Sequence, residues 1–127
     1  FYLQSLAELA PSFVARSLVF PVPVGWSRFN PTLTRGPHGL TAIVRSGNYT
    51  VNDRGQYTAN DHDGVVRTAN YLLRLASDGA VPDVNLIDDE AVRAAPPLFP
   101  VTGFEDCRLI WQDCAWWASA TTAFPCG

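Results

Sequence analysis

Residues 65–75, VVRTANYLLRL, form a short apolar run that is rich in β-branched and aromatic residues. Turn-forming residues border the run on both sides, from Asp61 to Gly64 before it and at Ser77-Asp78-Gly79 after it. Runs of this length and composition between polar turns are typical of β-strands. Residues 65–75 therefore predict a strand.

Similar runs recur on both sides of this one. The predicted strands are Arg28–Thr34, Leu40–Arg45, Val65–Leu75, Val84–Ile87, Arg108–Gln112 and Trp116–Thr122, with further turns at Gly36-Pro37, Asn52 to Gly55 and Pro96-Pro97. Short strands at even spacing predict an all-β domain, which is a sandwich, a barrel or a propeller. The length of 127 residues suits one domain, and a hydrophobic share of 47% is ample for a core.

The N-terminal part of the chain departs from this pattern, so we assign residues 1–24 to a short helix or arm and residues 25–127 to the domain. Leucines recur at helical spacing over residues 2–10, and Pro11 ends that pattern. The residues that follow alternate between apolar and polar and fit an extended arm or an edge strand. Because the chain begins with Phe1 and not with Met, we expect a fragment or a processed product.

The charge balance argues against several classes of function. Nine basic residues against twelve acidic residues give a net charge of −3, and all the basic residues are arginines spread along the chain. Without a basic patch we expect no nucleic-acid partner. The apolar stretches fall far short of the roughly 18 residues of a membrane span, and the N-terminus lacks the features of a signal peptide. We therefore expect a cytoplasmic protein without membrane contact.

The three cysteines and the acidic segment at residues 60–64 are the candidate metal ligands. An odd number of cysteines (Cys107, Cys114 and Cys126) without repeated spacing argues against a disulfide framework and against a zinc site. We expect reduced thiols, with a Cys107–Cys114 disulfide as the alternative. The segment NDHDG at residues 60–64 resembles a calcium loop but lacks ligands at the required positions, so we expect a polar turn and no metal.

The densest cluster of polar side chains is in GFEDCRLI at residues 103–110. Successive side chains of a strand point to opposite faces, so we expect Asp106 and Arg108 to share one cavity and Glu105 to face away from it. An arginine beside an aspartate orients the carboxylate and can also bind a phosphate or a sugar hydroxyl. The alternative is a structural pair of Asp106 with Arg108 that closes a turn.

Two further polar residues lie in predicted strands. Asn30 precedes Pro31, which favours extended backbone and leaves the amide free to reach into a pocket. Arg45 ends the apolar run of residues 40–45, where a strand meets a ligand or the solvent. A core-capping asparagine and a surface arginine are the alternatives. The tryptophans within residues 111–117 either stack against a sugar or fill the core.

Three segments, in this order and at this spacing, resemble the five-bladed β-propeller glycoside hydrolases and phosphorylases, nearest to the mannoside phosphorylases of glycoside hydrolase family 130. They are Phe29-Asn30-Pro31-Thr32, Ile43-Val44-Arg45 through Asn48-Tyr49, and Gly103-Phe104-Glu105-Asp106-Cys107-Arg108. The last is similar to the Gly-x-Glu-Asp-Pro-Arg signature that opens the second blade, with cysteine in place of proline. The resemblance covers about residues 25–122. It implies a partial propeller of about one and a half to two blades, since a blade takes roughly 40–50 residues.

The resemblance also implies roles for these residues. Asp106 would be the general acid that protonates the glycosidic oxygen. The sugar or phosphate would be surrounded by Asn30, Arg45, Asn48, Glu105 and Arg108. We expect no cofactor. Inorganic phosphate is the possible co-substrate, because a phosphate nucleophile removes the need for a second carboxylate.

The sequence is compatible with three functions. The first is a carbohydrate-active enzyme, either a glycosidase or a glycoside phosphorylase. Because the resemblance implies a partial propeller, the chain can be inactive by itself. The second is a non-catalytic glycan-binding propeller associated with glycosyltransferase machinery, which predicts exposed tryptophans and Asp106 held in an ion pair. The third is a β-sandwich interaction domain, which predicts that Arg45 and Asp106 lie far apart. Open blade edges also predict self-association.

Overall fold

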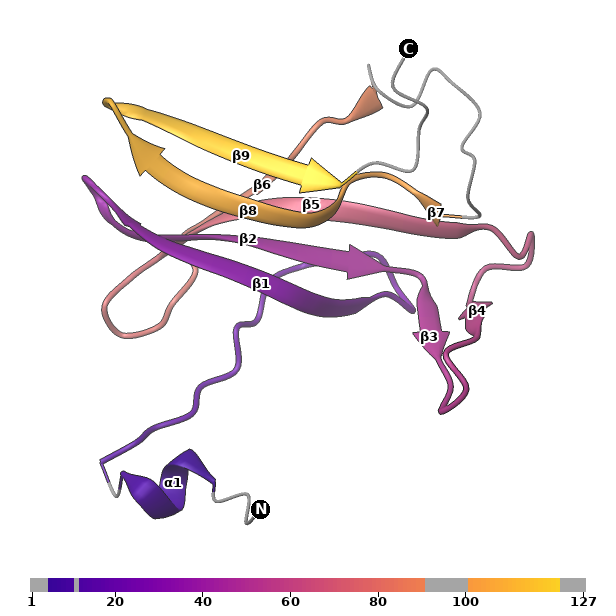
Figure 1. The fold of residues 1–127 in the computed structure, drawn as a ribbon, viewed down its shortest axis with the longest axis horizontal. Coiled ribbons are helices and arrows are strands. Elements are labelled where there is room, and N and C mark those ends of the chain that lie inside the picture. Colours follow the sequence, from indigo (N-terminus) through magenta and orange to yellow (C-terminus); the bar gives the residue numbers. More distant parts are fainter. Residues whose placement is uncertain (1–4, 11, 91–100, 122–127) are drawn as a thin grey trace.

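The computed structural model describes residues 5–10, 12–90 and 101–121, and these residues form an all-β protein with one helical turn (Figure 1). The main sheet contains β1 (Ser27–Gly36), β2 (Gly39–Gly47), β5 (Val66–Leu75) and β6 (Asp83–Leu86), in the order β1-β2-β5-β6. Neighbouring strands on this path are antiparallel, and β7 (Val101–Thr102) pairs in parallel with the start of β5.

Two hairpins complete the fold. They are β3 (Tyr49–Val51) with β4 (Tyr57–Ala59), and β8 (Glu105–Gln112) with β9 (Ala115–Thr121). The all-β prediction is confirmed, and each predicted strand is found, as β1, β2, β5, β6, β8 and β9. The β3–β4 hairpin was not predicted beyond its turn at Asn52 to Gly55. Over the described residues the sheets do not close into a barrel.

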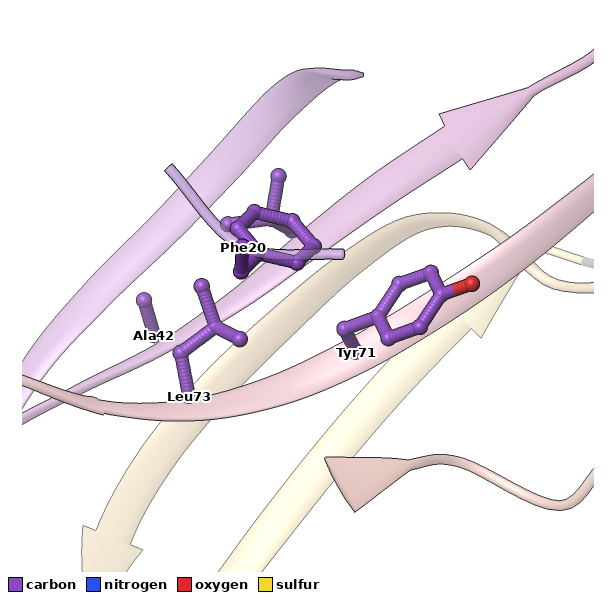
Figure 2. Packing of buried hydrophobic residues seen from close by; sticks show 5 residues of the cluster. Phe20, Ala42, Tyr71 and Leu73 are labelled. Carbon is purple, nitrogen blue, oxygen red and sulfur yellow. The ribbon is translucent and has the colours of Figure 1, made fainter. Parts of the chain in front are cut away.

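The central strands β2 and β5 are buried on both faces, which explains their nearly continuous apolar sequence. One face carries Ala42, Tyr71 and Leu73, and Phe20 of the N-terminal arm packs on it, with its ring centroid 5.4 Å from that of Tyr71 (Figure 2). On the other face Ile43 packs with residues of β8. The β8–β9 hairpin therefore forms a second layer over β1 and β2 (Figure 1).

The N-terminal segment is mainly an arm. A helix of the predicted length is not seen: within the described residues the helical part is the single turn α1, Leu6–Leu9, which Ser5 and Glu8 cap reciprocally. The leucines at its two ends are exposed, so no apolar surface supports a longer helix, and isolated short helices are marginal in water. The predicted arm follows, and it is anchored where Arg28 Nε donates to the Phe20 carbonyl oxygen at 3.1 Å.

The structure also bears on the predicted thiols, the polar turn and the absence of a membrane-spanning helix. Cys107 and Cys114 are free thiols, so the alternative disulfide is not formed, while Cys126 and the Pro96-Pro97 turn lie outside the described residues. The polar turn over residues 60–64 is confirmed, since the Gly64 N–H donates to the Asp61 carbonyl oxygen at 3.1 Å. In the part of the chain that the structure describes, no helix has the length and apolar character to span a membrane.

The connection between β4 and β5 is held by a polar clamp. Asn48 is fully buried, and its Nδ2 donates to Asp61 Oδ2 at 2.6 Å and to the Val65 carbonyl oxygen at 2.8 Å. Arg67 Nη1 donates to Asp63 Oδ1 at 3.0 Å. This hydrogen bond from Arg67 is the largest cause that lowers the pKa of Asp63 from 3.8 to about 2. The clamp therefore depends on the charged form of Asp63.

We expect the Asp63 clamp to make the protein sensitive to acid. Because the pKa of Asp63 is lower in the folded state, its contribution to stability is present above pH 3.8 and is lost as the pH falls towards 2. Asp63→Asn should remove this part of the pH dependence. Urea unfolding between pH 2 and pH 6 measures it, with Asp53→Asn in the β3–β4 turn as the control. Identical pH profiles for Asp63→Asn and the unchanged protein would contradict the assignment.

Gly103, which precedes β8, makes a close backbone approach to β5. Its φ is +111°, and an added Cβ would meet the Thr68 side-chain oxygen and lie 2.8 Å from the Thr68 carbonyl oxygen. Nearby, Asn70 Nδ2 donates to the Phe104 carbonyl oxygen at 2.9 Å. The start of β8 is thus placed against β5 by a contact that only glycine permits.

Gly103→Ala should lower the free energy of unfolding by roughly 2–5 kcal/mol, because it combines an unfavourable left-handed backbone with a steric clash. Gly55→Ala is the matched control. Gly55 also has a positive φ, of +76°, but an added Cβ there has no neighbour within 4 Å. The control should therefore lose only roughly 1–2 kcal/mol. Equal losses in the two variants, measured by urea unfolding, would exclude the close approach as the cause.

Candidate functional site

A pocket of about 310 Å³ lies between the β3–β4 hairpin and the paired residues Phe29 of β1 and Arg45 of β2. Its volume is at the lower end of the range of ligand pockets, roughly 300–1,000 Å³. The lining combines aromatic, amide and guanidinium side chains: Phe29, Asn30, Arg45, Tyr49, Val51 and Tyr57. The pocket is therefore shaped for a small ligand with both polar and apolar surface.

Arg45 is the centre of the polar contacts at this pocket. It is only 8% exposed, and its Nη1 lies 3.0 Å from Glu105 Oε1 and 3.6 Å from Asp106 Oδ1. Its guanidinium carbon lies 4.9 Å from the ring centroid of Phe29, in a cation–π contact. The wide separation of Arg45 and Asp106 that the sandwich alternative predicts is not found. Arg45 is also not a surface residue, so that alternative for it is wrong.

Both carboxylates reach Arg45 because β8 is irregular at this point. The β8–β9 register shifts between Glu105 and Arg108, and Asp106 has a φ of +47°. A bulge with left-handed backbone breaks the strict alternation of side chains. The prediction that Glu105 and Asp106 face opposite sides was therefore wrong. The Asp–Arg pair also forms between β8 and β2, and not between Asp106 and its neighbour Arg108 as the alternative proposed.

A second bulge lies opposite the first. The β1–β2 register shifts between Phe29 and Thr32, and Asn30 has a φ of +48°, which corrects the prediction of extended backbone before Pro31. The predicted reach of its amide is found: Asn30 Nδ2 donates to Asp106 Oδ1 at 3.0 Å. The two bulges thus face each other and are joined by a hydrogen bond at the rim of the pocket.

Left-handed backbone at these two residues points to a function. Four residues other than glycine have a positive φ in the described part of the chain, and two of them, Asp113 and Cys114, form the turn between β8 and β9. Two-residue hairpin turns require such backbone, but Asn30 and Asp106 are not in turns. Each such residue costs about 1–3 kcal/mol, and these outliers cluster at functional sites.

The other predicted site residues lie elsewhere. Asn48 is fully buried in the clamp that holds the β4–β5 connection, and it is not among the residues that line the pocket. Arg108 is exposed on the outer face of the β8–β9 hairpin, beside Ile110 and Trp117. Glu105 and Asp106 do not line the pocket themselves, but they contact the lining residues Arg45 and Asn30. The structure therefore brings together Asn30, Arg45, Glu105 and Asp106 but neither Asn48 nor Arg108.

The aromatic walls of the pocket were missed as site residues. Phe29 and Tyr49 have ring centroids 5.3 Å apart, and those of Tyr49 and Tyr57 are 5.0 Å apart. The available signal was the turn at residues 52–55: paired strands beside it place Tyr49, Val51 and Tyr57 on one face. Burial is the main cause that raises the pKa of Tyr49 above 10.0, so its hydroxyl stays protonated.

Cys107 stands where the resembled signature has proline, and it is buried below the site. Its side chain packs with Ile43 and Leu109 between β8 and the main sheet. Burial is the main cause that raises the pKa of the Cys107 thiol above 9.0. A neutral, buried thiol is a poor nucleophile and packs as a small apolar side chain. Cys107 therefore supports the position of β8 and takes no part in chemistry at the pocket.

Comparisons with models of protein families, with curated proteins and with solved structures have one result. None of them matches this chain. The chemistry of the pocket is therefore inferred from its own side chains. Within residues 5–10, 12–90 and 101–121, no group of histidine, cysteine, aspartate and glutamate side chains is arranged to hold a metal ion.

Removal of the guanidinium should destabilise the protein, because it leaves Glu105 and Asp106 close together without their cation. Arg45→Met keeps much of the side-chain volume and should cost about 3 kcal/mol of unfolding free energy. In the double variant Arg45→Met/Glu105→Gln one carboxylate is also removed, so part of that loss should be regained. A double-mutant cycle by urea unfolding should yield a coupling of roughly 0.5–3 kcal/mol. A coupling of zero would mean that the pair does not stabilise the fold.

Proposed function

We propose that the pocket around Arg45 binds a carbohydrate and that this chain is a glycan-binding module. Sugars present adjacent hydroxyl groups and patches of C–H bonds. Planar amide, carboxylate and guanidinium groups bind the hydroxyls, and aromatic rings pack against the C–H patches. Asn30, Arg45 and Asp106 supply the first kind of group, and Tyr49 and Tyr57 supply the second.

The contacts of Asp106 carry this proposal. Its Oδ1 accepts a hydrogen bond from Asn30 and lies 3.6 Å from the Arg45 guanidinium, so a hydrogen bond and an ion pair hold one carboxylate oxygen. A residue held in this way is preorganised to accept hydrogen bonds from sugar hydroxyls, whereas a general acid has to deliver a proton. Exposure of Trp117 and Trp116, at 59% and 36%, further supports the binding function over the catalytic one.

Acid catalysis by Asp106 is the second candidate function. The Asp106 side chain is 54% exposed, so a glycosidic oxygen bound in the pocket could approach it. In this case the module would belong to a glycosidase or to a phosphorylase that uses inorganic phosphate as the nucleophile, as the resemblance to glycoside hydrolase family 130 implies.

We further propose that the fold is part of a propeller. The four antiparallel strands β1-β2-β5-β6 would form one blade, and the β8–β9 hairpin would begin the next. Packing of β8 over β1 and β2 supports this arrangement (Figure 1). The edge strands β1 and β6 expose Leu33 and Leu86, which supports the predicted self-association. A cytoplasmic location and the absence of nucleic-acid partners stay part of the proposal.

A glycan array probed with the labelled protein tests the binding function. Asp106→Asn removes the charge of the carboxylate and should weaken binding about tenfold, because hydrogen bonds to charged groups contribute roughly 1.5–3 kcal/mol. Asp113→Asn in the β8–β9 turn is the matched control, since Asp113 also has a positive φ and asparagine tolerates that backbone. The control should bind as the unchanged protein does. Binding of no glycan by the unchanged protein would overturn the proposal.

The same variants separate binding from catalysis. Turnover of aryl glycosides is measured with and without added phosphate. If Asp106 is the general acid, Asp106→Asn abolishes turnover and leaves glycan binding intact. If Asp106 only binds, the unchanged protein shows no turnover and the variant loses affinity. Parallel loss of turnover and binding would exclude the acid role.

A further inference from the structure

We infer that the pocket selects saccharides by charge, so that it binds amino sugars and neutral sugars and rejects sugar phosphates and inorganic phosphate. This inference rests on the proposed glycan binding and names the ligand class for the same site. It also opposes a phosphate co-substrate, which the resemblance to phosphorylases implies. Three observations lead to it: the pairing of Arg45, the exposure of the carboxylates and the aromatic wall.

Among the residues that the structure describes, Arg45 is the one cation that lines the pocket, and its charge is already balanced. Glu105 and Asp106 lie 3.0 Å and 3.6 Å from the same nitrogen, Nη1, so one positive charge faces two negative charges. An anionic ligand would have to displace a carboxylate from Arg45 or stay beside both of them. Either outcome opposes binding of an anion.

The carboxylates are also nearer to the solvent than the guanidinium. Side-chain exposure is 10% for Arg45, 25% for Glu105 and 54% for Asp106. Asp106, the most exposed of the three, is therefore open to groups of a ligand that projects from the pocket beside Arg45. Two carboxylates against one guanidinium leave this group with a net negative charge, so the local field favours cations.

Neighbouring arginines are engaged away from this pocket. Arg28, the residue before Phe29, donates from Nε to the Phe20 carbonyl oxygen on the arm side of the sheet. Arg67 pairs with Asp61 and Asp63 in the clamp. Arg108 lines the separate surface beside Trp117. The net charge of the Arg45–Glu105–Asp106 group is therefore not reversed by these side chains.

The aromatic wall adds an attraction for cations. Tyr57 is 48% exposed and lines the pocket next to Tyr49. The faces of aromatic rings attract ammonium groups. Arg45 already occupies the face of Phe29, which shows that a ring of this cluster serves as a cation–π partner within the protein itself. An ammonium group beside Tyr57 would combine this attraction with that of Asp106.

Matched sets of monosaccharides test the inference. Glucose, galactose and mannose are each compared with their 2-amino-2-deoxy and 6-phosphate forms by titration calorimetry or NMR at low ionic strength, and inorganic phosphate is titrated alone. The amino sugar should bind about fivefold more tightly than the neutral sugar, and the phosphate form should bind at least about fivefold more weakly. The differences should shrink in 0.5 M salt, because ions at about this concentration screen exposed charges strongly.

Glu105→Gln removes one carboxylate and should flatten this order, so that the amino sugar loses its advantage and the sugar phosphate gains affinity. Asp113→Asn, in the β8–β9 turn and outside the pocket lining, is the control and should keep the order. If Glu105→Gln does not fold, Asp106→Asn makes the same change of charge. Equal binding of the three forms, or tightest binding of the phosphate form, would overturn the inference but leave glycan binding in place. Failure of every saccharide to bind would overturn the proposed function, and this inference with it.

Discussion

The position of the β8–β9 hairpin depends on the ion pair that Arg45 makes with Glu105 and Asp106. An arginine that is 8% exposed destabilises a protein unless carboxylates compensate its charge. Here the arginine comes from β2 of the main sheet and both carboxylates come from β8. A hairpin shifted along β2 would leave the arginine buried without a partner. The ion pair thus selects one register between the two layers, and it places Glu105 and Asp106 beside Arg45, which lines the pocket.

Apolar contacts and the polar site both lie at the interface between the main sheet and the β8–β9 hairpin. Ile43 of β2 packs against Cys107 and Leu109, and Arg45, two residues further along β2, pairs with Glu105 and Asp106. The apolar contacts supply the attraction between the layers, and the ion pair supplies the specificity of the register. Stability and the charges beside the pocket are therefore coupled, because a change that moves β8 alters the apolar packing and also the ion pairs of Arg45.

Part of this architecture could be predicted from local sequence. The strands follow from short apolar runs between turn residues, and the arm follows from its prolines and its alternation. The resemblance groups six residues, and the structure brings four of them together, namely Asn30, Arg45, Glu105 and Asp106, while Asn48 and Arg108 lie elsewhere. Local sequence predicted a helix over residues 2–10, but within the described residues 5–10 it forms one turn, because the exposed Leu6 and Leu9 have no surface to pack on.

Local sequence encodes the strands and their turns and supplies the polar residues near the pocket, because β-propensity and turn chemistry act over a few neighbouring residues. Which of those residues meet depends on how the strands pair and pack in the folded protein. The bulges at Asn30 and Asp106 rotate side chains out of the expected alternation, and they arise where two particular strands pair. Pairing between strands far apart in the chain is not encoded locally. For that reason Glu105 and Asp106 share Arg45, while Arg108 faces the opposite side of the hairpin.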